Sequence, residues 1–255
     1  APAGDFRSMQ QTIYHRILLL ANIHPAVTGF CPGKSVSDNA RVHLGRKNVL
    51  KVDLHDFFPS IRSPRVRAAF REMGYSRPIA KVLAELCCLR CCLPQGAPTS
   101  PALSNIIAYP MDKKMMALAG EYGLVYTRYA DDLTFSGDYL SKDEVLVRIH
   151  RIIREEGFTM NVKKTRFLSG HKRKIITGVS VSSGKKMTLP KVKKREIRKN
   201  VHYVLTKGLV GHQEHIGSTD PIYLKRLLGS LCYWRSIEPD NRYVSDSITA
   251  LKRLM

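Results

Sequence analysis

Acidic residues are scarce in this chain, so the places where they stand together are informative. Lysine and arginine number 42 against 21 aspartates and glutamates, which gives 255 residues a formal net charge of +21. Asp131 and Asp132 are adjacent between apolar runs, and Asp53 lies at the end of another short apolar run. Neighbouring carboxylates repel one another unless a cation neutralises them. Hard divalent ions suit such a site, although a bare Asp-Asp pair is more commonly a solvated turn.

The apolar runs around these acids predict the strands that would position them. Residues 124–129 and 133–136 predict a hairpin with the two adjacent acids at its tip, and residues 49–54 predict a third strand. If the third strand pairs in the same sheet, three carboxylates converge. They could then hold two Mg²⁺ ions roughly 4 Å apart, with Mn²⁺ as an alternative, which is the geometry for in-line phosphoryl displacement.

The remaining pattern mixes strands and helices, which indicates an α+β fold. Turn signals fill residues 25–47, and a strand pair is expected within 162–181. From residue 185 the chain becomes basic and helical, so a small helical module is expected at the C-terminal end. Apolar periodicity and capping signals predict helices at 8–20, 64–73, 77–89, 100–119, 143–156, 221–235 and 243–254.

Composition excludes several classes of protein. Hydrophobic residues make up 44% of the chain, enough for a packed core, which argues against wholesale disorder. No apolar run reaches the roughly 18 residues that a membrane helix needs. The positive charge therefore points to a polyanion, and to nucleic acid more than to a membrane surface. Because the first residue is Ala1 and the opening is typical of mid-domain sequence, we expect residues to precede it in the native protein.

Four of the six cysteines, Cys87, Cys88, Cys91 and Cys92, lie in one short block. A zinc site would need a second pair of ligands at a suitable spacing, and the sequence offers none that is convincing. Core thiols in a reducing cytoplasm are the favoured interpretation, and a metal site is the alternative.

Three longer strings carry a family resemblance. Residues 53–61 (DLHDFFPSI), 93–101 (LPQGAPTSP) and 129–132 (YADD) follow one another as the palm motifs of a reverse transcriptase do, and together they resemble that family. The resemblance implies a right-hand polymerase whose fingers lack their usual first strands. Its parts would be fingers over 1–50, a palm over 51–184 with a fingers insertion at about 62–98, and a helical thumb over 185–255.

The resemblance also implies roles for single residues. Asp53, Asp131 and Asp132 would be the catalytic metal ligands, with the Leu54 backbone carbonyl as a further ligand. Phe58 would be a steric gate that rejects the ribose 2′-hydroxyl. Only one of two successive strand side chains can face the site, so core packing is the alternative for Phe57 and Phe58. The remaining nucleotide-binding residues would be Asp56, Gln95, Gly96 and Lys164; a surface acid and a solvated lysine are the alternatives for Asp56 and Lys164.

Two shorter strings resemble retron reverse transcriptases in particular. Residues 39–43 fit the Asn-Ala-x-x-His signature, and residues 176–178 resemble Val-Thr-Gly with isoleucine in place of valine. The resemblance implies that Asn39, His43, Thr177 and Gly178 bind a structured noncoding RNA. A satisfied loop histidine and a turn at a strand end are the alternatives.

A basic segment begins the predicted thumb. Eight lysines and arginines fall within residues 185–199, where like charges repel, so a polyanion partner is favoured over a solvated face. By resemblance, this segment would follow the backbone of a template–primer duplex. The residues expected to do so are Lys191, Lys193, Lys194, Arg195, Arg198 and Lys199.

The resemblance implies an RNA-directed DNA polymerase of the retron type. It would copy a structured noncoding RNA, which is both template and primer, from deoxynucleoside triphosphates. Priming from an internal guanosine 2′-hydroxyl would leave RNA-linked single-stranded DNA (msDNA), in a cytoplasmic anti-phage defence system with an effector protein as partner and no membrane. The alternatives are a different bacterial reverse transcriptase, intron-encoded or defensive, and a scaffold that holds RNA–DNA and restrains an effector.

Overall fold

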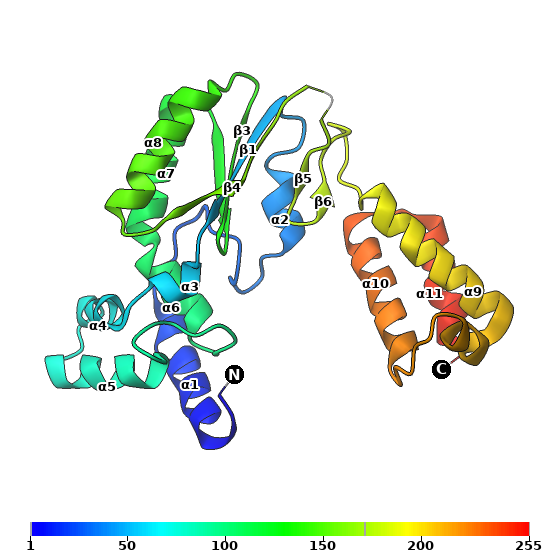
Figure 1. Cartoon of the computed structure of the whole chain (residues 1–255), viewed down its shortest axis with the longest axis horizontal. Helices are drawn as coiled ribbons and strands as arrows, with labels where there is room; N and C mark the ends of the chain where they lie inside the picture. Colours follow the sequence, from blue (N-terminus) through cyan, green and yellow to red (C-terminus); the bar gives the residue numbers. More distant parts are fainter. Residues whose placement is uncertain (1, 171, 255) are drawn as a thin grey trace. The chain divides into compact units, whose positions relative to one another are not determined.

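The computed structural model describes residues 2–170 and 172–254, and the chain divides into two compact units (Figure 1). The first unit spans residues 1–172 and the second spans residues 173–255. The first contains an antiparallel sheet with helices around it, and the second is mainly helical. This combination confirms the predicted α+β class. The division into fingers, palm and thumb stays a prediction.

A four-stranded antiparallel sheet organises the first unit, in the order β2-β3-β1-β4. The interior strand β1 is buried along most of its length, and its apolar residues are interrupted only by Lys51 and Asp53. The sequence predicted a strand over residues 49–54 and left its pairing conditional; in the structure this strand, β1, pairs with β3. The strands are β1 (Asn48–Leu54), β2 (Val125–Tyr129), β3 (Asp132–Gly137) and β4 (Met160–Leu168).

Helices cover both faces of this sheet (Figure 1). Met115 of α7 and Ile149 of α8 are buried in the core with Tyr126 and Phe135 of the sheet. Strand side chains alternate between faces, so the neighbours Thr127 and Ser136 point away from this core, toward the α2 side. The helices of this unit are α1 (Gly4–Arg16), the 3-10 turn η1 (Leu18–Leu20), α2 (Val36–Arg41), α3 (Phe57–Ser60), α4 (Ser63–Glu72), α5 (Arg77–Cys87), α6 (Ser100–Ile107), α7 (Tyr109–Glu121) and α8 (Lys142–Glu155).

Three local predictions differ from the structure. The helix expected over 100–119 is two helices, α6 and α7, because Pro110 lacks the amide hydrogen that a continuous helix would need there. The residue types also predict Ser100 as the N-cap of that helix with Pro101 at its first position, but Thr99 takes the N-cap position of α6. The short α2 was not expected within the turn-rich residues 25–47, although a capping box between Ser35 and Asp38 fixes its start.

The second unit packs three helices around Trp234. Its side chain is fully buried, and Ile197, Leu231 and Ile248 from the three helices are buried as well. A short hairpin, β5 (Ile175–Ile176) and β6 (Val179–Ser180), precedes the helices. The helices are α9 (Lys191–His215), α10 (Tyr223–Ile237) and α11 (Arg242–Lys252). In neither unit does a described helix have both the length and the apolar character that a bilayer crossing demands.

Candidate active site

The strand register brings the three predicted acids to one end of the sheet. Asp53 of β1 lies directly opposite Asp132 of β3. The next residue, Leu54, donates its backbone N–H to the carbonyl oxygen of Asp131 at 2.9 Å. The juxtaposition that the sequence made conditional on strand pairing is therefore present.

A buried ion pair supports the turn that carries two of these acids. Ala130 adopts left-handed backbone geometry, with φ of 56°. Arg128 donates from Nη1 to the Ala130 carbonyl oxygen at 3.1 Å and from Nη2 to Asp112 Oδ2 at 2.7 Å. The side chains of Arg128 and Asp112 are both fully buried, and Tyr126 donates its hydroxyl to Asp112 Oδ1 at 2.7 Å. The turn is thus held from below by a completely hydrogen-bonded polar cluster.

The segment around Gly29 packs against the same turn. Thr28 donates its N–H to the Arg128 carbonyl oxygen at 2.9 Å, and Asn105 donates from Nδ2 to the Gly29 carbonyl oxygen at 2.9 Å. A Cβ atom on Gly29 would meet the backbone nitrogen of Ala130 at 2.6 Å, so only glycine fits here. No local pattern in the sequence indicates these contacts, because they join segments that are far apart in the chain.

The negative charges of the three acids are not fully compensated by the described residues. Burial raises the pKa of Asp131 and of Asp132 above its ordinary value, and the neighbouring carboxylates raise each pKa further. Asp53 Oδ1 is buried and has no hydrogen-bond partner within the described residues. Its other oxygen, Oδ2, contacts Lys164 Nζ of β4 at 3.3 Å, and this bond raises the pKa of the lysine. The cluster therefore attracts positive charge.

These residues fit a divalent metal by their chemistry. A partnerless buried carboxylate oxygen beside two further carboxylates is a hard, oxygen-only donor set of the kind that Mg²⁺ prefers. Among the described residues, no group of three or more His, Cys, Asp or Glu side chains is already gathered closely enough to hold an ion.

The two successive phenylalanines take different environments on a helical turn, α3, where the sequence suggested a strand. Phe57 is buried, and its ring lies 5.5 Å from that of Phe158. Phe58 is only partly buried, with its ring 6.0 Å from that of the exposed Phe30. Phe57 is therefore the core residue and Phe58 the one nearer the surface. The ring of Phe30 also lies 6.3 Å from that of Tyr129. The sequence did not predict a place for Phe30 near the site.

The other predicted nucleotide-binding residues lie on loops near strand and helix ends. Asp56 is exposed, has left-handed backbone geometry and lies 3.1 Å from His55 Nδ1. Gln95 and Gly96 are exposed between α5 and α6, and Gly96 has φ of 81°. Lys164 is beside Asp53, as described above. Nucleotide binding by these residues stays a prediction.

The two predicted RNA-binding residues of the first unit are buried. His43 hydrogen-bonds to Ser136 Oγ at 2.7 Å and to Thr127 Oγ1 at 2.8 Å. Burial lowers the pKa of His43 to about 4. Asn39 accepts a hydrogen bond from Thr28 Oγ1 at 2.9 Å. Because neither side chain reaches the surface, their predicted role in RNA binding requires an indirect route, through the segments that they support.

The other retron-type string forms a tight turn. Thr177 and Gly178 have φ values of 44° and 82° and connect β5 to β6. Positive φ at both central positions is typical of a two-residue hairpin turn, and glycine adopts it without strain. The turn interpretation is therefore observed, and contact of this turn with RNA stays a prediction.

The predicted nucleic-acid-binding residues of α9 fall into three groups. Lys194 Nζ contacts Glu238 Oε1 at 2.6 Å, and the guanidinium of Arg198 lies 5.5 Å from the Trp234 ring centre, so both are engaged inside the second unit. Lys193 contacts Glu196 at 3.0 Å on the surface. Three exposed cations, at spacings of four residues, make no ion pair with a described residue: Lys191, Arg195 and Lys199.

The cysteine block is partly interior. Cys87 is buried, and burial raises its pKa to about 12. Burial likewise raises the pKa of Cys88 to about 11. A raised pKa keeps a thiol protonated and unreactive, which favours the core interpretation for these two residues.

Comparison with known proteins identifies the class that this fold and site belong to. Residues 1–204 match the family model described as reverse transcriptase (RNA-dependent DNA polymerase). Since the match covers most of the chain, the protein belongs to the reverse transcriptase family, whose members depend in general on divalent metal. The three acids and the antiparallel sheet thus lie within the matched region.

The curated relatives narrow the class to the retron type. The chain is 36% identical over 217 residues to the retron Ec86 reverse transcriptase of Escherichia coli, which covers 84% of this chain and 67% of the relative. It is 34% identical over 260 residues to the retron Mx65 reverse transcriptase of Myxococcus xanthus, at 94% and 58% coverage. The chain therefore spans between a half and two thirds of these relatives' lengths. A Candida albicans telomerase solved with a telomeric RNA fragment aligns with 98% of the chain at TM-score 0.47 and 9% identity, too low to add to the argument.

Proposed function

We propose that this chain is the polymerase part of a retron reverse transcriptase, which copies a structured noncoding RNA into RNA-linked single-stranded DNA. One observation carries the proposal: Asp53 lies opposite Asp132, with Asp131 adjoining, on a turn held by the buried Arg128. Family membership and the retron relatives support the same activity.

Each group at the sheet end has a part in this chemistry. Asp53, Asp131 and Asp132, with the Leu54 carbonyl, would hold divalent metal, for which we propose two Mg²⁺ ions with Mn²⁺ as the alternative; bound there, they supply charge neutralisation and activation of the primer hydroxyl. Lys164, beside Asp53, neutralises negative charge on the triphosphate.

The nucleotide is positioned by the loops around the acids. Asp56 offers its backbone to the triphosphate, Gln95 contacts the incoming nucleotide, and Gly96 permits close backbone approach. Phe58 excludes the ribose 2′-hydroxyl, because its neighbour Phe57 is already used in the core.

Two segments bind the RNA: the basic residues of α9 and the turn between β5 and β6. The proposed setting is the cytoplasm, within an anti-phage system that includes an effector protein. The outward cations of α9, which are Lys191, Arg195 and Lys199, neutralise phosphates of the template–primer duplex. The Thr177–Gly178 turn contacts the noncoding RNA, and Asn39 and His43 act by supporting their surroundings.

The proposal is tested by DNA synthesis with the cognate RNA, deoxynucleotides and Mg²⁺. We expect Asp131→Asn with Asp132→Asn to reduce synthesis by roughly a thousandfold, because several kcal/mol of charge stabilisation are lost. The matched control is Asp138→Asn with Asp143→Asn, two exposed acids just beyond the same strand, which should leave synthesis unchanged. Equal synthesis by both double variants, or none by the wild type, would refute the proposal.

The assignment of Phe58 has its own test. We expect Phe58→Ala to raise incorporation of ribonucleotides relative to deoxynucleotides by about tenfold, because a site that excludes a group sterically loses that exclusion with the ring. Phe30→Ala, which removes the neighbouring exposed ring, is the control and should change the ratio less. If the wild type already uses both sugars equally, Phe58 is not a gate.

A further inference from the structure

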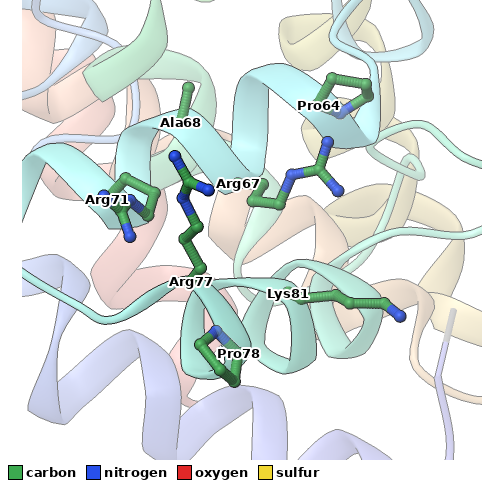
Figure 2. Close-up of a pocket in the computed structure, with 7 residues that line it drawn as sticks. All are labelled: Pro64, Arg67, Ala68, Arg71, Arg77, Pro78 and Lys81. Atoms are coloured by element: carbon green, nitrogen blue, oxygen red, sulfur yellow. The ribbon is translucent and has the colours of Figure 1, made fainter.

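A hollow lined by basic residues lies between α4 and α5, apart from the three acids in the sheet. The two helices pack against each other as a hairpin, and the hollow between their outer surfaces has a volume of about 710 Å³. Figure 2 shows Arg77 reaching from α5 toward Ala68 on α4. The lining residues are Pro64, Arg67, Ala68, Arg71, Arg77, Pro78 and Lys81, and no acid is among them.

The cations of this hollow are uncompensated within the part of the chain that the structure describes. Arg67, Arg71 and Arg77 are exposed and form no ion pair with a described residue, and Lys81 reaches Glu85 only at 4.0 Å. Four like charges around one hollow repel each other. The arrangement therefore favours an anionic ligand that touches both helices.

The cations of the hollow lie on the side of α4 and α5 that faces away from the core. Val66 and Phe70 of α4 and Leu83 of α5 are buried in the core. Arg65 is directed elsewhere, with its guanidinium 4.5 Å from the Phe158 ring centre. The cations of the hollow are thus on the outward side of the hairpin, and packing of the hairpin does not depend on them.

The shape and floor of the hollow indicate which polyanion fits. Pro64, Ala68 and Pro78 provide a small apolar floor, and both prolines lie in the first turn of their helices, where the backbone is rigid. Arginine guanidinium groups bind phosphate through two donors and stack on base faces. Base faces are accessible in an unpaired strand and hidden in a duplex, whose surface is convex. An unpaired strand therefore matches the concave site better than a duplex does.

We propose that the hollow between α4 and α5 binds an unpaired segment of RNA, with phosphates on the arginines and a base or ribose against the proline floor. The inference rests on the proposed function only in taking RNA as the ligand. Because it concerns binding and involves no catalytic residue, it can fail while the polymerase assignment stands, and the reverse.

The test measures binding of a fluorescent oligouridylate to the full chain as a function of salt, without metal or deoxynucleotides. Arg71→Gln with Arg77→Gln removes one cation from each helix. We expect the slope of log affinity against log salt to become shallower by about 1.4, since each phosphate contact on a single strand contributes about 0.7. Between 50 and 200 mM salt, the variant should therefore lose about sevenfold less affinity than the wild type does.

A charge-matched control is Lys113→Gln with Arg154→Gln, two exposed helical cations that form no ion pair with a described residue. It should keep the wild-type slope. An unchanged slope in the variant with Arg71→Gln and Arg77→Gln, or an equal change in the control, overturns the proposal. So does an equal change with a fully paired RNA duplex or with polyglutamate, which would assign the hollow to duplex RNA or to an acidic protein. Thermal unfolding of both variants should match the wild type.

Discussion

Asp112 and the three acids at the strand ends all lie near the β2–β3 hairpin, but they differ in how far their carboxylates are hydrogen-bonded within the chain. Asp112, beneath the hairpin, is fully buried, and both of its carboxylate oxygens accept hydrogen bonds from Arg128. At the strand ends, Asp53 keeps one buried oxygen without a partner among the described residues, and the pKa values of Asp131 and Asp132 are raised by burial and by their neighbours.

The difference shows that partners, more than burial, separate a charge that is completed within the chain from one that is open to a ligand. The interior pair is complete within the chain, so it can fix the backbone of the turn at Ala130. The acids at the strand ends are incomplete within the described residues, and we propose that a divalent cation completes them. Unsatisfied groups of this kind are tolerated where function requires them.

The largest expected effect comes from breaking the interior pair. We expect Arg128→Met to lower the free energy of unfolding by about 3–5 kcal/mol, because Asp112 is left as an uncompensated buried charge. Urea denaturation measures the change. DNA synthesis should fall as well, since the same arginine holds the Ala130 carbonyl oxygen.

Two further variants decide whether partner loss is the cause. Replacing both residues, Arg128→Met with Asp112→Leu, should recover much of the stability, because no buried charge then stays unpaired. Lys164→Met removes the exposed partner of Asp53 and should change stability by less than about 1 kcal/mol. If Arg128→Met and Lys164→Met have similar effects, the distinction between the two groups of acids is wrong.

A second prediction uses the buried His43, another completed polar group of the interior. Its pKa is about 4 in the folded chain against an ordinary value of 6.5, so the unfolded chain takes up the proton first as the pH falls. The stability that neutral His43 contributes is therefore complete above pH 6.5 and is lost as the pH falls toward 4. The loss should amount to about 3 kcal/mol.

The variant His43→Gln isolates this contribution from those of other titrating groups. Glutamine can still hydrogen-bond to Thr127 and Ser136 but does not titrate. Its unfolding free energy should fall less steeply between pH 6.5 and 4 than that of the wild type. Parallel pH profiles would show that folding does not lower the pKa of His43, and that burial does not keep it neutral.

Local patterns were enough to predict the part of the fold that carries the acids. The apolar runs of β1, β2 and β3 have strand lengths, and the acids lie at or near their ends. That β1 pairs with β3, and so aligns Asp53 with Asp132, was left conditional by the sequence and is seen in the structure. The break at Pro110 was also available from the sequence, since a proline inside a helical pattern signals a new helix.

The supports of the site had no comparable local signal. Asp112 and Arg128 are sixteen residues apart, on a helix and a strand, and nothing in either segment marks them as partners. Gly29 is required only because the Ala130 backbone lies against it. The surface role expected for Asn39 and His43 was open to the same uncertainty, because a short motif does not reveal which way its side chains point.

The smallest of the three effects extends the comparison to the cations of α9. The outward residues lack partners among the described residues, so we expect Lys191→Gln, Arg195→Gln and Lys199→Gln together to weaken binding of an RNA–DNA duplex. The slope of log affinity against log salt should become shallower by about 2 to 3, the contribution of three phosphate contacts. Fluorescence anisotropy over a salt series measures it.

Lys194 and Arg198 of the same helix, which contact other groups of the second unit, provide the control. Lys194 is paired with Glu238, and Arg198 lies over Trp234, so Lys194→Met with Arg198→Met should leave the salt slope nearly unchanged. That variant should instead lower the thermal stability, because Glu238 loses its partner and the aromatic rings lose a cation. If this double variant changes the slope as much as the triple variant does, contacts within the second unit do not keep a cation from binding nucleic acid. The distinction between completed and incomplete charges would then hold only for Asp112 and the acids at the strand ends.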